Sequence, residues 1–158
     1  MAKKFKKKPF RDWLDTLARI VVKTDDNFTC QIQQSPNCAG QMLPLDKNCQ
    51  WCHIKSRSRN DLRWHCLNNI TGCGQCHQWG HANPNDFGVW FAKTYPKRQE
   101  IINLIAQQHP HTWYEGEYKA VELSLLTEAK RIGVDYMNIP ERFRMRLKRK
   151  LEELKLRR

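Results

Sequence analysis

The stretch CQWCHIKSRS, from Cys49 to Ser58, decides how the middle of this chain is expected to fold. It places two cysteines in the spacing of a metal-binding knuckle and puts His53 directly after the second one. Lysine, arginine and serine follow at once. The stretch alone leaves two interpretations open: His53 is a further zinc ligand, or it does chemistry beside a phosphate group.

The seven cysteines of the chain offer two alternative sets of four metal ligands. One set reads Cys49-x2-Cys52-x20-Cys73-x2-Cys76 and fits the general template of a four-cysteine zinc site. The other set reads Cys30-x7-Cys38 and shares its second pair, Cys73 and Cys76, with the first set. The remaining cysteine, Cys66, is expected to be a small buried apolar residue.

Three histidines and an asparagine follow one another at defined distances. Fourteen residues separate His53 from Asn68, eight separate Asn68 from His77, and three separate His77 from His81. Residues at i and i+4 lie on one face of a helix, so the last two imidazoles can bind a single ion. A strand, a loop and a helix can therefore surround one metal and leave His53 to act on water.

The order His53, Asn68, His77, His81 resembles the HNH endonuclease motif, also called ββα-metal, with a spacing similar to that of the nuclease colicins. The sequence CHIKSRSRNDLRW…LNNITGCGQCHQWGHANPNDFGVWF also resembles small phage HNH proteins, including the NinG/Rap recombination nucleases. The resemblance covers about residues 28–95. It implies an α+β fold: a zinc-stapled ββα-metal (His-Me finger) core with an N-terminal helix and several C-terminal helices.

The resemblance also implies a function and a role for each matched residue. The function is metal-dependent hydrolysis of DNA phosphodiester bonds by an endonuclease or nickase, in bacteriophage DNA processing or recombination. His53 is the general base, Asn68 holds the turn that orients it, and His77 and His81 bind a catalytic divalent ion, Mg²⁺, Mn²⁺, Ni²⁺ or Zn²⁺. The family places a further metal ligand, His or Asp, where this chain has Cys52.

A cysteine at position 52 departs from the family, because a thiolate is a poor ligand for Mg²⁺. Cys52 binds a transition metal at the catalytic site, has no catalytic role, or belongs to the structural zinc. Cys49 and Cys52 lie on the strand that leads into the expected active site, which makes them awkward for a closed zinc site. The structural zinc is therefore assigned to the other set: Cys30, Cys38, Cys73 and Cys76.

The composition points to a polyanionic partner. The chain has 28 Lys and Arg residues against 16 Asp and Glu residues, a formal net charge of +12. DNA is the expected partner, and no membrane is expected because no apolar run is long enough to cross a bilayer. Four cations within ten residues of His53 are expected to contact phosphates, although they could equally form a solvated basic loop: Lys55, Arg57, Arg59 and Arg63.

The N-terminal sequence MAKKFKKKPF lacks the apolar segment of a secretory signal, so the chain is expected in the cytoplasm, where thiols stay reduced. Three parts are expected along the chain: a basic arm (1–11), a nuclease core that includes an N-terminal helix (12–96), and a helical extension with a basic last helix (97–158). Helical patterns begin near residues 12, 74, 85, 97, 117 and 140.

Each functional interpretation has a structural alternative. His53 could be a packed strand histidine or a zinc ligand, and Asn68 a helix-entry cap with Asn69 as the functional asparagine. His77 and His81 could be surface residues of a helix. The alternative function is a non-catalytic zinc-binding DNA adaptor, and a third is an RNA-directed protein of the same build. Substrate structure, sequence preference and oligomeric state are not predicted.

Overall fold

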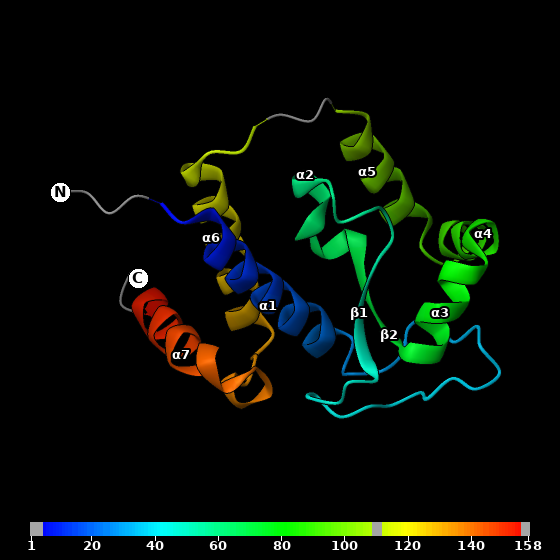
Figure 1. The fold of residues 1–158 in the computed structure, drawn as a ribbon, viewed down its shortest axis with the longest axis horizontal. Helices are drawn as coiled ribbons and strands as arrows, with labels where there is room; N and C mark the ends of the chain where they lie inside the picture. Colours follow the sequence, from blue (N-terminus) through cyan, green and yellow to red (C-terminus); the bar gives the residue numbers. More distant parts are fainter. Residues whose placement is uncertain (1–4, 109–111, 156–158) are drawn as a thin grey trace. The chain divides into compact units, whose positions relative to one another are not determined.

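The expected α+β class is confirmed: the chain is mostly helical, with a small antiparallel sheet. The fold is that of a computed structural model, which describes residues 5–108 and 112–155 (Figure 1). Within these ranges, no helix is long and apolar enough to cross a membrane. The elements are α1 (Lys7–Asp25), β1 (Cys49–His53), α2 (Asn60–Arg63), η1 (Cys66–Asn68), β2 (Asn69–Cys73), α3 (Gly74–Ala82), α4 (Pro84–Thr94), α5 (Pro96–Gln107), α6 (Glu115–Arg131), η2 (Tyr136–Asn138) and α7 (Glu141–Lys155).

The chain divides into two compact units. Unit 1 combines the two ends of the chain, Met1–Val21 and Thr112–Arg158, and unit 2 is Val22–His111. The sequence suggested a division near residue 96, whereas the structure keeps α5 in the same unit as the sheet. That placement matters for the site, because α5 contacts the loop between the two strands.

Unit 1 is built on the apolar faces of α1, α6 and α7. Trp13, Leu14, Leu17 and Val21 recur at helical spacing on α1 and are buried. Helix α1 begins at Lys7, earlier than the expected start at Asp12. The first lysines of the predicted arm lie outside the described residues.

A charged group lies inside this helical unit. Glu122 is 7% exposed and accepts a hydrogen bond from Trp13 Nε1 at 2.6 Å. Arg146 and Lys150 on α7 reach the same carboxylate, at 3.0 and 3.5 Å. A buried charge is stable only when it is paired in this way.

Unit 2 contains a hairpin followed directly by a helix. Strands β1 and β2 are antiparallel, with Cys49 opposite Cys73 and His53 opposite Asn69. Helix α3 begins at Gly74, immediately after β2 ends, so the start of the helix is fixed by the end of the strand (Figure 1). Along the chain, the structure has a strand, a loop, a second strand and a helix in this order.

Prolines open the next two helices of unit 2. Pro84 and Pro96 stand in the first turns of α4 and α5, where a missing backbone N–H costs no helical hydrogen bond. Phe91 and Ile102 on these helices are fully buried in the same core as Ile70 of β2. Helix α5 is therefore part of the core of unit 2.

Candidate metal centre and histidine site

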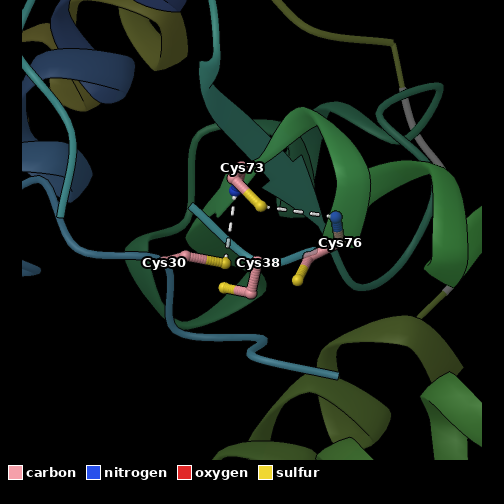
Figure 2. Close-up of side chains that lie close together, drawn as sticks. All are labelled: Cys30, Cys38, Cys73 and Cys76. Atoms are coloured by element: carbon pink, nitrogen blue, oxygen red, sulfur yellow. Dashed lines mark hydrogen bonds between the residues drawn. The ribbon is translucent and has the colours of Figure 1, made fainter. Parts of the chain in front are cut away.

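Four cysteine side chains converge in unit 2. Cys30 and Cys38 come from the irregular segment after α1, Cys73 ends β2, and Cys76 lies in the first turn of α3. Their sulfur atoms all lie within 4.8 Å of one another, and Figure 2 shows the four side chains turned toward a common point. A tetrahedral zinc ion with Zn–S bonds of about 2.3 Å holds its sulfurs about 3.8 Å apart, close to this arrangement.

Backbone N–H groups surround these sulfurs. Cys73 N donates to Cys30 Sγ at 3.2 Å, and Cys76 N donates to Cys73 Sγ at 3.4 Å (Figure 2). Ala39 N donates to Cys73 Sγ and Ser35 N to Cys76 Sγ, each at 3.5 Å. Such donors favour thiolates over neutral thiols, as a metal site requires.

The pKa values in the cluster reflect a balance between burial and these hydrogen bonds. Burial raises the pKa of Cys73, but N–H groups of Ala39 and Cys76 outweigh it and leave the pKa at about 7. Burial raises the pKa of Cys30, and it raises the pKa of Cys76 to about 12. These two thiols therefore keep their protons at neutral pH until a cation replaces them.

The four-cysteine cluster can hold a metal ion and is compatible with a structural zinc. The structure brings together the set that takes its first pair from Cys30 and Cys38. Cys49 and Cys52 stand outside that set: both are buried in β1, and Lys23 donates a hydrogen bond to the carbonyl oxygen of Cys49. The remaining cysteine, Cys66, is half-buried.

Cys52 is buried in the same core as the cysteines of the cluster. A Cβ atom on Gly72 would lie 2.7 Å from Cys52 Sγ and 2.8 Å from Ile32 Cδ1, so a larger residue at that position of β2 would force these side chains to shift. Burial, followed by the nearby Cys30 and Cys73, raises the pKa of the Cys52 thiol. In residues 5–108 and 112–155, the cluster described above is the one group of three or more Cys, His, Asp or Glu ligands that converges. Cys52 is thus not gathered with the α3 histidines.

The two histidines of α3 face each other. His77 Nε2 and His81 Nε2 are 3.1 Å apart. Two imidazole nitrogens bound to one ion at about 2.0–2.1 Å lie about 3.0–3.4 Å apart, so the pair has the spacing of two ligands of one metal. His77 Nδ1 is hydrogen-bonded to Gln50 Oε1 on β1, and an Nδ1–H donor in this contact corresponds to the tautomer that turns its other nitrogen, Nε2, toward His81.

Burial also affects the protonation of His77. Its half-buried position, followed by the nearby His81, lowers its pKa below the usual value of 6.5. A lowered pKa keeps the imidazole neutral at physiological pH, and only the neutral ring binds a metal.

Asn68 holds the chain just beyond His53. It is fully buried. Its Oδ1 accepts from Lys55 N at 2.8 Å, and its Nδ2 donates to Lys55 O and Leu62 O, both at 3.1 Å. Asn69 instead donates to Arg63 O and His65 O. Both asparagines therefore hold the loop after β1, and Asn68 is the one that binds the residue two beyond His53.

His53 ends β1 and is half-buried, opposite Asn69 in the sheet. Its ring lies against Trp51, with ring centroids 4.2 Å apart. Gln50, on the same strand as His53, hydrogen-bonds His77 of α3. The strand that carries His53 is therefore in contact with the helix that carries His77 and His81.

The four cations expected at phosphates have different environments. Arg57 is exposed, and Lys55 is half-buried beside Asn68. Arg59 donates to the carbonyl oxygens of Ile105, Ala106 and Gln108 at the end of α5 and pairs with Asp61. Arg63 donates to Arg57 O at 3.1 Å.

Two contributors to the site carried no sequence signal. Gln50 hydrogen-bonds the ring of His77 from a neighbouring strand, and Arg98 of α5 binds the carbonyl oxygens around Asn68. Both contacts join segments far apart in the chain, so no local spacing marks them.

Comparison of the chain with protein-family models, with curated proteins and with solved structures found no match.

Proposed function

We propose that the chain is a metal-dependent endonuclease or nickase of the HNH type, with β1, β2 and α3 as its ββα-metal core. The observation that carries the proposal is the joint geometry of Asn68, His77 and His81. Asn68 ties down the residue two beyond His53, and the two Nε2 atoms on α3 stand 3.1 Å apart. The predicted role of Asn68 requires a side chain that holds the chain beyond His53, and the predicted role of His77 and His81 requires two nitrogens close enough to bind one ion.

The side chains divide the work of phosphodiester hydrolysis. His77 and His81 would hold a divalent ion, which would supply charge stabilisation for the phosphate and the leaving oxygen. His53 accepts the proton of the attacking water, a task that suits a neutral imidazole. Asn68 acts on His53 indirectly, through its hydrogen bonds to the main chain of Lys55, whereas Gln50 hydrogen-bonds the ring of His77 directly.

The ligands favour certain ions. Imidazole nitrogens suit Ni²⁺ and Zn²⁺, whereas Mg²⁺ prefers oxygen ligands. Because Cys52 stays in the core, His77 and His81 would be the protein ligands of the ion. We therefore expect Ni²⁺ or Zn²⁺ to support activity better than Mg²⁺.

A zinc ion in the cysteine cluster would position the site without taking part in the reaction. Cys73 and Cys76 lie on either side of the junction between β2 and α3, and Cys76 is followed directly by His77. A closed four-thiolate zinc keeps no open coordination position, so its role is structural. It fixes the direction of α3 and with it the two histidines.

The distribution of charge supports a nucleic-acid substrate. Unit 1 holds 19 of the 28 Lys and Arg residues and 10 of the 16 Asp and Glu residues, a net charge of +9. Unit 2 holds the remaining 9 and 6, a net charge of +3. A polyanion is attracted to such a chain, and most of the attraction comes from the helical unit.

Metal-dependent nicking of supercoiled plasmid tests the proposal. Purified protein is incubated with Mg²⁺, Mn²⁺, Ni²⁺ or Zn²⁺, and wild type is compared with His77→Ala and with Gln78→Ala, an exposed neighbour on α3. We expect nicked or linear product for wild type and Gln78→Ala, and none for His77→Ala. Product that appears equally with EDTA would contradict the proposal.

A non-catalytic zinc-binding DNA adaptor is the second candidate. The observation in its favour is that only two ligands are gathered on α3, since Cys52 is not gathered with them. DNA binding by a zinc-loaded protein that cleaves with none of the four ions would support the adaptor.

A further inference from the structure

The loop of residues 54–68, between the two strands, is fastened to α5 at both ends of that helix. Arg98, in the first turn of α5, donates from Nη2 to Leu67 O and Asn69 O, each at 2.9 Å, and to Cys66 O at 3.4 Å. Its Nε also donates to Leu67 O at 3.2 Å. One guanidinium thus holds the carbonyl oxygens on both sides of Asn68.

In the second contact the donor lies on the loop and the acceptors lie at the end of α5. Arg59 lies on the loop and donates to Ala106 O at 2.6 Å, Gln108 O at 2.8 Å and Ile105 O at 3.3 Å, the carbonyl oxygens at the end of α5. Ile105 O also accepts the backbone N–H of Gln108. The last carbonyls of a helix carry its negative dipole end, which favours a cation. Asp61 holds the guanidinium in place at 2.6 Å.

Both contacts use properties that lysine lacks. Arg98 reaches three carbonyl oxygens because a guanidinium carries several donors in a fixed plane. Its plane lies near the rings of Tyr95 and Phe91, at 4.9 and 5.6 Å from their centroids. An ammonium group would keep the charge but lose this geometry.

We infer that Arg59 and Arg98 form an arginine clamp that makes α5 a positioning element for His53. The inference rests on the proposed function. The path is short: Arg98 fixes the main chain around Asn68, Asn68 fixes Lys55, and Lys55 follows His53 by two residues. The clamp residues touch neither the metal pair nor His53, so they act by position alone.

Arg98→Lys, which keeps the charge, tests the clamp, with Lys97→Gln on the same turn of α5 as the matched control. Misplacement of a reacting group by about 1 Å costs about a hundredfold in rate. We expect Arg98→Lys to lower kcat about 10- to 100-fold with KM nearly unchanged, since positioning is lost and binding is kept. Nicking kinetics measure both constants, and Lys97→Gln should resemble wild type.

A second readout does not depend on activity. In NMR spectra, the imidazole signals of His53 and their pH titration should shift in Arg98→Lys and stay in place in Lys97→Gln. Arg59→Lys breaks the clamp from the other end and should produce the same shift, which covers the case in which Arg98→Lys does not fold. Unchanged His53 signals in a folded clamp variant would overturn the inference. If wild type cleaves nothing, the proposed function fails, and the NMR comparison still decides the clamp.

Discussion

The two units of this chain are stabilised by different means. Unit 1 packs the apolar faces of long helices around Trp13 and Leu17, and its buried carboxylate, Glu122, is paired with Trp13 and Arg146. Unit 2 has a short sheet and long irregular segments, and it is held by the cysteine cluster, Asn68 and the arginine clamp. The units also differ in charge: unit 1 carries most of the positive charge, and unit 2 holds the residues that we propose to be catalytic.

Loss of a cluster cysteine should have the largest effect and should be confined to unit 2. Structural zinc contributes roughly 10–16 kcal/mol of apparent binding free energy, which is folding free energy in such sites. We expect Cys30→Ser to lose the bound zinc and the protection of α3 against hydrogen exchange, while α6 stays protected. Cys49→Ser, also buried but outside the cluster, is the control. Zinc lost from Cys49→Ser and kept in Cys30→Ser would show that the other ligand set is right.

The converse experiment removes a core side chain of unit 1. Trp13→Ala deletes a fully buried ring and the donor to Glu122, a change that costs about 3–5 kcal/mol in protein cores. We expect faster hydrogen exchange in α6 and α7 with zinc content unchanged. Equal loss of protection in α3 and α5 would contradict separate stabilisation of the two units.

Charge removal should separate the units by their affinity for DNA. Lys7→Gln, Lys8→Gln and Lys148→Gln together remove three exposed cations from unit 1, and Lys47→Gln, Lys93→Gln and Lys97→Gln remove three from unit 2. Each lost phosphate contact reduces the salt slope of binding by about 0.9. Fluorescence anisotropy at several salt concentrations should show a slope flatter by about 2–3 for the unit 1 triple variant. Equal slopes for the two triple variants would remove the distinction.

Acidification should lower the free energy of unfolding of unit 2, and its histidines should contribute a modest part of that loss. Burial lowers the pKa of His65 and His77, so below pH 6.5 the unfolded state binds protons that the folded state does not. Stability therefore falls as the pH drops through the interval between the usual and the lowered pKa. Urea unfolding of wild type and His77→Gln between pH 5 and 7.5 measures it, and we expect a flatter dependence for the variant. Parallel curves would show that His77 does not contribute.

Much of this architecture follows from local signals in the sequence. Pro84 and Pro96 mark the starts of helices because proline suits a first turn. The i, i+4 spacing of His77 and His81 brings their Nε2 atoms together whatever the rest of the chain does. The cysteine set could be chosen because one of the two candidate pairs lies on the strand that ends at His53.

Contacts between distant segments could not be predicted in this way. Arg59 looks like a phosphate-binding residue in a basic loop, and only the packing of α5 shows that its donors are already in use. Arg98 and Gln50 carry no motif, because their partners lie on other elements. The position of α5 in unit 2 was missed for the same reason.

Cleavage by the His53→Ala variant tests most directly the proposal that His53 is the general base of a metal-dependent nuclease. Plasmid nicking rates are measured with the preferred ion, alongside zinc content and DNA affinity by anisotropy. Loss of a general base lowers the rate by about a hundred- to ten-thousandfold. We expect such a loss with zinc content and DNA affinity unchanged. A folded, zinc-loaded His53→Ala protein that cleaves at the wild-type rate would contradict it.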